Sequence, residues 1–187
     1  MQYKEIEYKY WAGSLSKDEF CEKVYLILPE RKEPIHVVSC DDYFVMDHME
    51  NGTFLRYRKG DGKKELTLKV KERDNVVRKE INLNLDGNDD SLISQFITLG
   101  GYRKVHAIFK EAWVFLTPNC DLSYYTLPTG ESFIEVEAKE YSTVEEGISI
   151  LNQWVNSLGI QGHKRESRSL FEIFNDKIKV DGIIELK

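Results

Sequence analysis

The sequence predicts an α+β fold in which helices pack outside a mainly antiparallel sheet, either open or closed into a barrel. The expected elements run strand, helix, several strands, helix, several strands, helix, without the strand–helix–strand alternation of a parallel sheet. Most strands alternate charged and apolar residues, as strands with one buried face do. At 187 residues, of which 41% are hydrophobic, the chain fits one domain with a substantial core.

The strands are predicted from alternation, from β-branched and aromatic residues, and from turn signals. Asn51-Gly52 is a turn, and Gly60-Asp61-Gly62 joins the two strands of a hairpin. The expected strands cover residues 1–10, 35–46, 54–58, 66–71, 76–85, 102–116, 122–127 and 133–139, with a final edge strand at 178–186.

The helices are predicted from their cap residues and apolar periodicity. Ser16 followed by Glu19, and Thr143 followed by Glu146, are capping-box patterns at helix starts. Pro29 ends the first helix. The expected helices cover residues 17–28, 92–99 and 144–158, with a short one at 170–174.

Composition argues against several classes of protein. The net charge of −6 argues against general nucleic-acid binding, although it is compatible with a concentrated basic pocket. No apolar run approaches the length of a membrane span, and the N-terminus, with Lys4, Glu5 and Glu7, does not resemble a signal peptide. The three cysteines fit neither a disulfide framework nor a zinc site, so a reducing cytoplasm is the expected location.

Charged residues two positions apart recur on the predicted strands with an ordered chemistry. The acidic residues gather on the first strand and on the strand at 133–139, whereas the central hairpin is basic. The groups are Glu5/Glu7/Lys9, Arg56/Arg58, Lys69/Lys71, Arg78/Glu80 and Glu135/Glu137/Lys139.

If the sheet closes, these charges point into its lumen. Several Arg and Lys side chains there need anions, because like charges repel strongly at low dielectric. Arg and Lys suit phosphate oxygens, and carboxylates beside a phosphate site suit Mg²⁺ or Mn²⁺. The sequence therefore predicts a site for a metal-bound polyphosphate, and a solvated charged sheet face is the alternative interpretation.

With these motifs the chain resembles the CYTH superfamily, the triphosphate tunnel metalloenzymes, which includes class IV adenylyl cyclases, thiamine triphosphatases and inorganic triphosphatases. The resemblance runs from about Glu5 to Phe174. The motifs are Glu5-x-Glu7-x-Lys9, Asp41-x-Tyr43-Phe44, Leu55-Arg56-x-Arg58, Leu66-Thr67-x-Lys69, Arg78-x-Glu80, Leu99-Gly100-Gly101-Tyr102, Phe133-x-Glu135-x-Glu137 and Arg168-Ser169. It implies an α+β fold with an eight-stranded antiparallel β-barrel, the triphosphate tunnel, and helices packed outside. One domain would span residues 1–187, with a core over about 3–176.

The resemblance also implies roles for individual residues. Glu80 would support the metal ligands. For hydrolysis, our own candidate for the catalytic group is Tyr43 with Lys69, which would orient or deprotonate the attacking water. The metal ligands would be Glu5, Glu7, Glu135 and Glu137. The phosphate-binding residues would be Lys9, Arg56, Arg58, Lys69, Lys71, Arg78, Lys110 and Arg168.

Three positions depart from the family pattern. Ala112 stands on the long strand where the family has Arg, so one phosphate contact would be missing. The Asp that usually precedes the Gly-x-Phe-x-Glu motif is not at its expected place. Tyr125 is nearest by count, and Asp121 matches only with a longer loop. Val45 replaces the Asp after Tyr-Phe.

Three functions are compatible with such a site. The first is metal-dependent hydrolysis of an inorganic, thiamine or nucleoside triphosphate, favoured because the chain lacks the His-Phe that often opens the cyclase subgroup. The second is a class IV-type adenylyl cyclase, and the third is a non-catalytic binder of nucleotide or polyphosphate. The expected partners are a small-molecule triphosphate or nucleotide and Mg²⁺ or Mn²⁺, without nucleic acid or membrane, and the chain is expected to be a monomer or homodimer.

Overall fold

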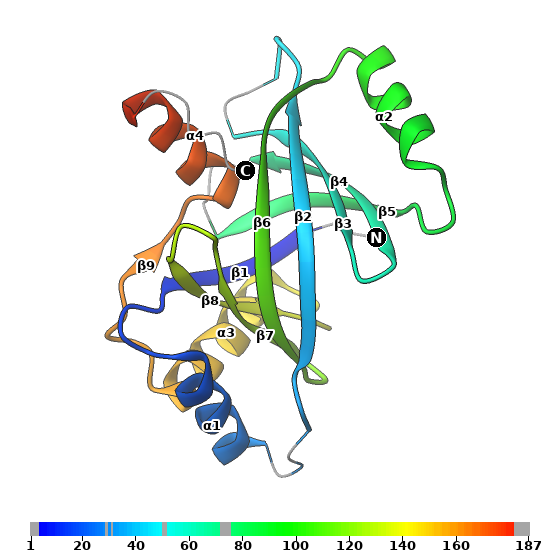
Figure 1. Ribbon diagram of the computed structural model, residues 1–187. Helices are drawn as coiled ribbons and strands as arrows, with labels where there is room; N and C mark the ends of the chain where they lie inside the picture. The colour runs from blue at the N-terminus through cyan, green and yellow to red at the C-terminus, as the bar shows by residue number, and fades with distance from the viewer. Residues whose placement is uncertain (1–3, 29, 31, 50–51, 72–75, 182–187) are drawn as a thin grey trace. The chain divides into compact units, whose positions relative to one another are not determined.

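The computed structural model describes residues 4–28, 30, 32–49, 52–71 and 76–181, which form nine strands and four helices (Figure 1). The strands are β1 (Lys4–Trp11), β2 (Ile35–Val45), β3 (Phe54–Gly60), β4 (Lys63–Lys71), β5 (Val77–Asn84), β6 (Arg103–Leu116), β7 (Cys120–Thr126), β8 (Ser132–Ala138) and β9 (Arg165–Glu166). The helices are α1 (Lys17–Ile27), α2 (Asp90–Leu99), α3 (Val144–Leu158) and α4 (Leu170–Asp181).

The strands form one sheet in the order β5-β4-β3-β2-β6-β7-β8-β1-β9. The pairs β1–β8, β2–β3, β3–β4, β4–β5, β6–β7 and β7–β8 are antiparallel, and the two-residue strand β9 pairs with β1 in the same sense. The predicted fold class is confirmed: the protein is α+β, with an eight-stranded antiparallel barrel and helices packed outside it.

The chain divides into two compact units. Unit 1 comprises Ser39–Phe109 and residues 168–181, and unit 2 comprises Lys4–Val38 and Lys110–Ser167. The strands β2 and β6 run from one unit into the other, so neither unit is one continuous stretch of chain. That the whole chain behaves as one domain stays a prediction.

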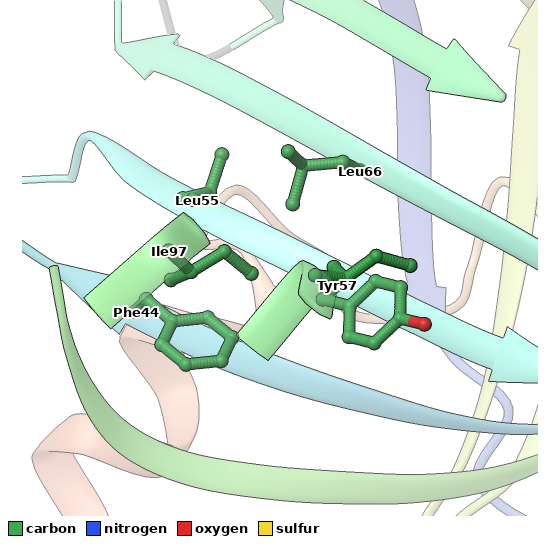
Figure 2. Close-up of a cluster of buried hydrophobic side chains, with 6 residues drawn as sticks. Phe44, Leu55, Tyr57, Leu66 and Ile97 are labelled. Carbon is green, nitrogen blue, oxygen red and sulfur yellow. The ribbon is translucent and has the colours of Figure 1, made fainter. Parts of the chain in front are cut away.

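In unit 1, α2 covers the apolar face of β2, β3 and β4. Two residues of the helix, Ile93 and Ile97, are buried against this face (Figure 2). The strands contribute Phe44, Leu55, Tyr57 and Leu66 to the cluster. Because successive strand residues point to opposite faces, Arg56 and Arg58 lie on the other face of β3.

In unit 2, α3 packs on β1 and β8, and α1 packs on β7. Leu151 and Val155 of α3 and Phe20 of α1 are buried. Gly147 allows α3 to approach β1 closely, because a Cβ at this position would lie 2.7 Å from Cδ1 of Ile6. A side chain at position 147 would therefore displace the helix or repack Ile6.

The predicted starts of α1 and α3 are confirmed, whereas α2 begins at Asp90, two residues before its predicted start. Pro29, which was predicted to end α1, lies outside the described residues. Ser16 and Glu19 form a complete capping box at α1, and the hydroxyl of Thr143 accepts a hydrogen bond from the backbone N–H of Glu146 at α3. Gly159 follows α3 with φ of +64°, a left-handed conformation that favours glycine. No helix among the described residues is long and apolar enough to cross a membrane.

The C-terminal region differs from the prediction. The helix expected at residues 170–174 continues to Asp181 as α4, so the predicted edge strand is wrong for residues 178–181, and residues 182–186 lie outside the described chain. Ser169 supports the start of α4 through reciprocal hydrogen bonds with Glu172. An alternating apolar tail is compatible with either structure, and periodicity over so few residues does not distinguish them.

Candidate functional site

The predicted site residues fall into two groups, one in each unit. Unit 1 holds the predicted catalytic pair, most of the phosphate-binding residues and the supporting carboxylate: Tyr43, Arg56, Arg58, Lys69, Lys71, Arg78, Glu80 and Arg168. Unit 2 holds the four predicted metal ligands and two cations: Glu5, Glu7, Lys9, Lys110, Glu135 and Glu137.

The register of β2 to β5 aligns the unit 1 residues in rows across the sheet. One row runs through Asp41, Arg58, Glu65 and Asn84. The next runs through Tyr43, Arg56, Thr67 and Asn82, and the third through Phe54, Lys69 and Glu80. Directly opposed residues share one face, so this face, which we call the cationic face, lies opposite the apolar cluster under α2.

Asp41 holds Arg58 in a bidentate ion pair on the cationic face. Nε and Nη2 of Arg58 donate to the two carboxylate oxygens at 2.6 and 2.7 Å. Asp41 is fully buried, so this carboxylate fixes the guanidinium plane with little competition from water. The sequence predicts no role for Asp41 beyond the Asp41-x-Tyr43-Phe44 motif, but its alternation with Tyr43 places both residues on this face.

Two further cations of this face are buried and are each held by a carboxylate of a nearby strand. Arg56 is 8% exposed, and its Nη2 donates to Glu65 at 3.1 Å and to Thr67 at 2.9 Å. Its Nε is buried and lacks a hydrogen-bond partner among the described residues. Lys69 is also 8% exposed, and its ammonium lies 2.7 Å from Glu80. Burying such cations without a partner is costly, and the carboxylates offset that cost.

Arg78 connects the cationic face to the start of α4. It is 5% exposed, and its guanidinium lies 3.6 Å from the carboxylate of Glu172. Arg168, just before α4, is half-buried, and Lys71 lies opposite Arg78 in the register of β4 and β5. Sequence reasoning missed Glu172, because nothing local to α4 indicates which strand it meets.

Tyr43 lies in an aromatic cluster on this face. Its ring centroid is 5.3 Å from that of Phe54, 5.2 Å from His106 and 5.8 Å from Phe171. Burial, with a smaller contribution from the carboxylate of Asp41, raises the pKa of Tyr43 well above its ordinary value. Tyr43 is therefore a neutral phenol that can donate a hydrogen bond, which favours orienting a water over deprotonating it.

His106 of β6 is a second residue of this cluster, and the sequence analysis did not assign it to the site. It stacks on Phe171 with 5.4 Å between ring centroids. Both ring nitrogens are buried without a hydrogen-bond partner among the described residues. Burial lowers the pKa of His106 to about 4, so the imidazole is neutral at pH 7.

In unit 2 the carboxylates line up across β1, β8 and β7. Glu7 lies opposite Glu137, which lies opposite Asp121 on the other side of β8. Glu135 is two residues before Glu137, and Glu5 is two residues before Glu7, so all five share one face. We call these five residues the acidic row. Counting residues in the sequence left open whether Asp121 or Tyr125 matches the Asp of the family pattern. The strand register places Asp121 in the acidic row.

Two ammonium groups lie among these carboxylates. Lys9 is 4% exposed, and its Nζ is 3.0 Å from Glu135 and 3.6 Å from Glu7. Lys139 lies 2.6 Å from Glu137 and 3.2 Å from Asp121, and despite its partial burial these carboxylates raise its pKa above the ordinary value. Each of these two ammonium groups therefore lies against two carboxylates of the row.

The donor set of the acidic row suits a hard divalent cation, which prefers carboxylate oxygens. Among the described residues, no three His, Cys, Asp or Glu side chains are arranged to hold a metal ion. Glu7 and Glu135 turn toward Lys9, and Glu137 turns toward Lys139. The chemistry of the row fits Mg²⁺ or Mn²⁺, and binding would require these carboxylates to turn from the ammonium groups to the ion.

Ala112 lies opposite Tyr125, where an aromatic side chain takes up the space. Ala112 is 5% exposed, and the Tyr125 ring stacks on Phe133 with 5.4 Å between centroids. The Tyr125 hydroxyl donates to Glu135 at 3.0 Å, and the ammonium of Lys110 lies 5.2 Å from the centre of the ring. Unit 2 thus has a phenol in contact with the acidic row beside the position where the family has an arginine.

Comparisons with known proteins support the fold. Neither a protein-family model nor a curated protein sequence matches the chain. The solved structure of the PH1012 protein from Pyrococcus horikoshii is similar, with a TM-score of 0.76 and 19% identity over 90% of this chain and 98% of that one. A Vibrio parahaemolyticus protein described as a "putative adenylate cyclase" has a TM-score of 0.72 and 17% identity, over 94% of this chain and 99% of that one.

At these identities the likeness shows the fold alone. The fold that the CYTH resemblance implies is confirmed. The inorganic triphosphatase NE1496 is also similar, but its TM-score of 0.37 and 13% identity over 78% of each chain are too low to support a conclusion.

Proposed function

We propose that the chain is a metal-dependent hydrolase of a triphosphate substrate. The observation that carries the proposal is the cationic face of unit 1, where Arg56, Lys69 and Arg78 are each less than a tenth exposed and lie on neighbouring strands. Buried cations arranged in this way suit the closely spaced charges of a polyphosphate. A solvated sheet face would expose them instead.

The carboxylates beside these cations preorganise them. Asp41 fixes the guanidinium of Arg58, and Glu80 fixes the ammonium of Lys69, so little reorganisation is needed when an anion arrives. Phosphoryl transfer is accelerated mainly by positioning and by neutralising charge on the phosphate oxygens. Arg56 and Lys69 would supply that neutralisation, with the buried Nε of Arg56 as one available donor.

The remaining roles belong to Tyr43 and to the acidic row. The neutral phenol of Tyr43 can donate a hydrogen bond that orients an attacking water. Glu5, Glu7, Glu135 and Glu137 would hold Mg²⁺ or Mn²⁺. When bound, the ion would neutralise phosphate charge and act as a Lewis acid.

The test is a panel of inorganic triphosphate, thiamine triphosphate and ATP, each with Mg²⁺ and with Mn²⁺. We expect orthophosphate release, with kcat/KM lowered at least about 100-fold in Arg78→Gln. Lys79→Gln is the matched control, because Lys79 is the exposed neighbour of Arg78 on the opposite face of β5. Equal activity of the two variants would contradict the role of the cationic face.

A second candidate function is favoured by the Vibrio parahaemolyticus comparison. In a class IV-type adenylyl cyclase the same cations would hold the triphosphate of ATP, while the ribose 3′-hydroxyl attacks the α-phosphate. Cyclic AMP with pyrophosphate, formed from ATP by the same panel, would identify this reaction. Binding of a triphosphate without any product would instead support a nucleotide or polyphosphate binder.

A further inference from the structure

The outer side of α2 in unit 1 carries large apolar side chains that remain exposed to solvent. Leu92 is 65% exposed, Phe96 is 73% exposed and Leu99 is 86% exposed. Their spacing of four and three residues places them in one line along the helix, which we call the α2 stripe. Surface apolar residues are ordinary when scattered, but a continuous line of three is typical of a contact surface.

The stripe exists because the apolar arc of α2 is wider than the sheet can cover. Ile93 and Ile97 face the strands and are 7% and 1% exposed. The sheet continues the exposed surface beside the helix: Ile81 and Leu83 of β5 are 43% and 53% exposed. Ile81 and Leu83 lie directly opposite two residues of β4 that pack against α2, so they lie on the same face of the sheet as α2. These β4 residues are Leu68 and Leu66.

We propose that the α2 stripe is a homodimer contact, with α2 of one copy antiparallel to α2 of a second copy. The stripe is nearly palindromic about Phe96, because a leucine lies four residues before it and another lies three residues after it. A two-fold axis at Phe96 therefore sets the two phenylalanine rings against each other. It also sets Leu92 of each copy against Leu99 of the other, as an isologous interface requires.

The charges at the two ends of α2 are complementary under the same two-fold axis. Asp89 and Asp90 lie at the N-terminal end of the helix. Arg103 and Lys104 follow its C-terminal end and are 66% and 51% exposed at their side chains, where Arg103 lies 3.6 Å from Asp47 and Lys104 lies 2.6 Å from Asp42 of the same chain. An antiparallel pair brings the acidic end of each helix to the basic end of the other, and it also pairs the helix dipoles favourably.

The contact is small. Ten helical residues extend only about 15 Å, so the interface lies at the low end of the size range of stable complexes even with Ile81 and Leu83 included. We therefore expect a reversible dimer whose population rises with concentration in the micromolar range.

Sedimentation velocity on the full chain between about 1 and 200 µM tests the proposal. We expect a monomer–dimer equilibrium that Phe96→Ser weakens more than about tenfold, because aromatic residues at an interface centre dominate binding. Leu26→Ser is the matched control: Leu26 is 83% exposed on α1 in unit 2 and should leave the dimer unchanged. A monomer over the whole range, or a dimer that Phe96→Ser does not weaken, would overturn the proposal.

Cysteine cross-linking tests the antiparallel arrangement. Under oxidation, Phe96→Cys should link to itself because it lies on the two-fold axis. Leu92→Cys should link to Leu99→Cys in a mixture of the two variants and should not link to itself. The unsubstituted chain, with its own Cys21, Cys40 and Cys120, supplies the background. Self-linking of Leu92→Cys as efficient as the mixed link would overturn the antiparallel contact.

Discussion

On the cationic face of unit 1, each of Arg56, Arg58, Lys69 and Arg78 lies against a carboxylate of a nearby strand or helix. In unit 2 the five carboxylates of the acidic row share the face of β1, β7 and β8 with Lys9 and Lys139. Unit 1 is therefore close to electrically balanced at its buried groups. The acidic row carries an excess of negative charge. The difference agrees with the proposed function, in which unit 1 would hold an anion and unit 2 would take up a cation.

The largest expected effect comes from breaking the balance in unit 1. Asp41→Asn keeps the shape of the side chain but removes the fully buried carboxylate that holds Arg58 in a bidentate pair, and the Arg58 side chain is itself only 27% exposed. We expect the free energy of unfolding to fall by about 3–5 kcal/mol, measured by urea denaturation. The control is Asp18→Asn, whose ion pair with Lys17 is solvent-exposed and should change the free energy of unfolding little. Similar losses in the two variants would mean that burial does not determine the strength of the Asp41–Arg58 pair.

A second prediction concerns the pH dependence of the free energy of unfolding, which His106 of unit 1 should dominate. The folded pKa of His106, about 4, lies below the ordinary value of 6.5, so the unfolded chain binds more protons between these values. Protonation of His106 therefore makes the folded chain lose stability as the pH falls from 6.5 to 4, by about 3 kcal/mol in total.

His106→Phe keeps the stack on Phe171 and removes both buried ring nitrogens. Urea denaturation between pH 4 and 7 should show a smaller loss of stability for the variant than for the unsubstituted chain. At pH 7 the variant should be at least as stable, because a buried unsatisfied group has been removed. An unchanged pH profile would mean that other groups cause the acid sensitivity.

The third prediction asks whether unit 2 has room for another cation. Ala112→Arg restores the residue expected from the family, but Ala112 is buried opposite Tyr125. Overpacking should lower the melting temperature by an amount equivalent to about 2 kcal/mol. Tyr125→Ser in the same chain should recover part of that loss, and no recovery would mean that Tyr125 does not fill the site.

The sequence predicted which charged residues share a face of each strand, but it did not predict which residues form ion pairs. Alternation of Arg56 with Arg58, and of Glu135 with Glu137, was enough to place each pair on one face. The partners Asp41, Glu65 and Glu172 could not be assigned, because strand register and helix docking join residues far apart in the chain. The apolar residues of the α2 stripe also could not be distinguished from core-facing residues in the sequence. Periodicity predicts an apolar side of a helix, but not how much of that side the sheet covers.

The smallest expected effect, and the direct test of the charge excess in unit 2, is stabilisation by the metal alone. At a concentration about ten times its Kd, Mg²⁺ or Mn²⁺ should add about 1 kcal/mol to the free energy of unfolding, seen as a rise in melting temperature. Glu7→Gln should abolish the rise, whereas Glu145→Gln, exposed on α3, should leave it intact. Lys139→Met removes an ammonium that holds Glu137 and Asp121, so it should increase the metal affinity. If Lys139→Met weakened binding instead, the ammonium groups would not be competitors of the metal, and the excess of carboxylates would need another explanation.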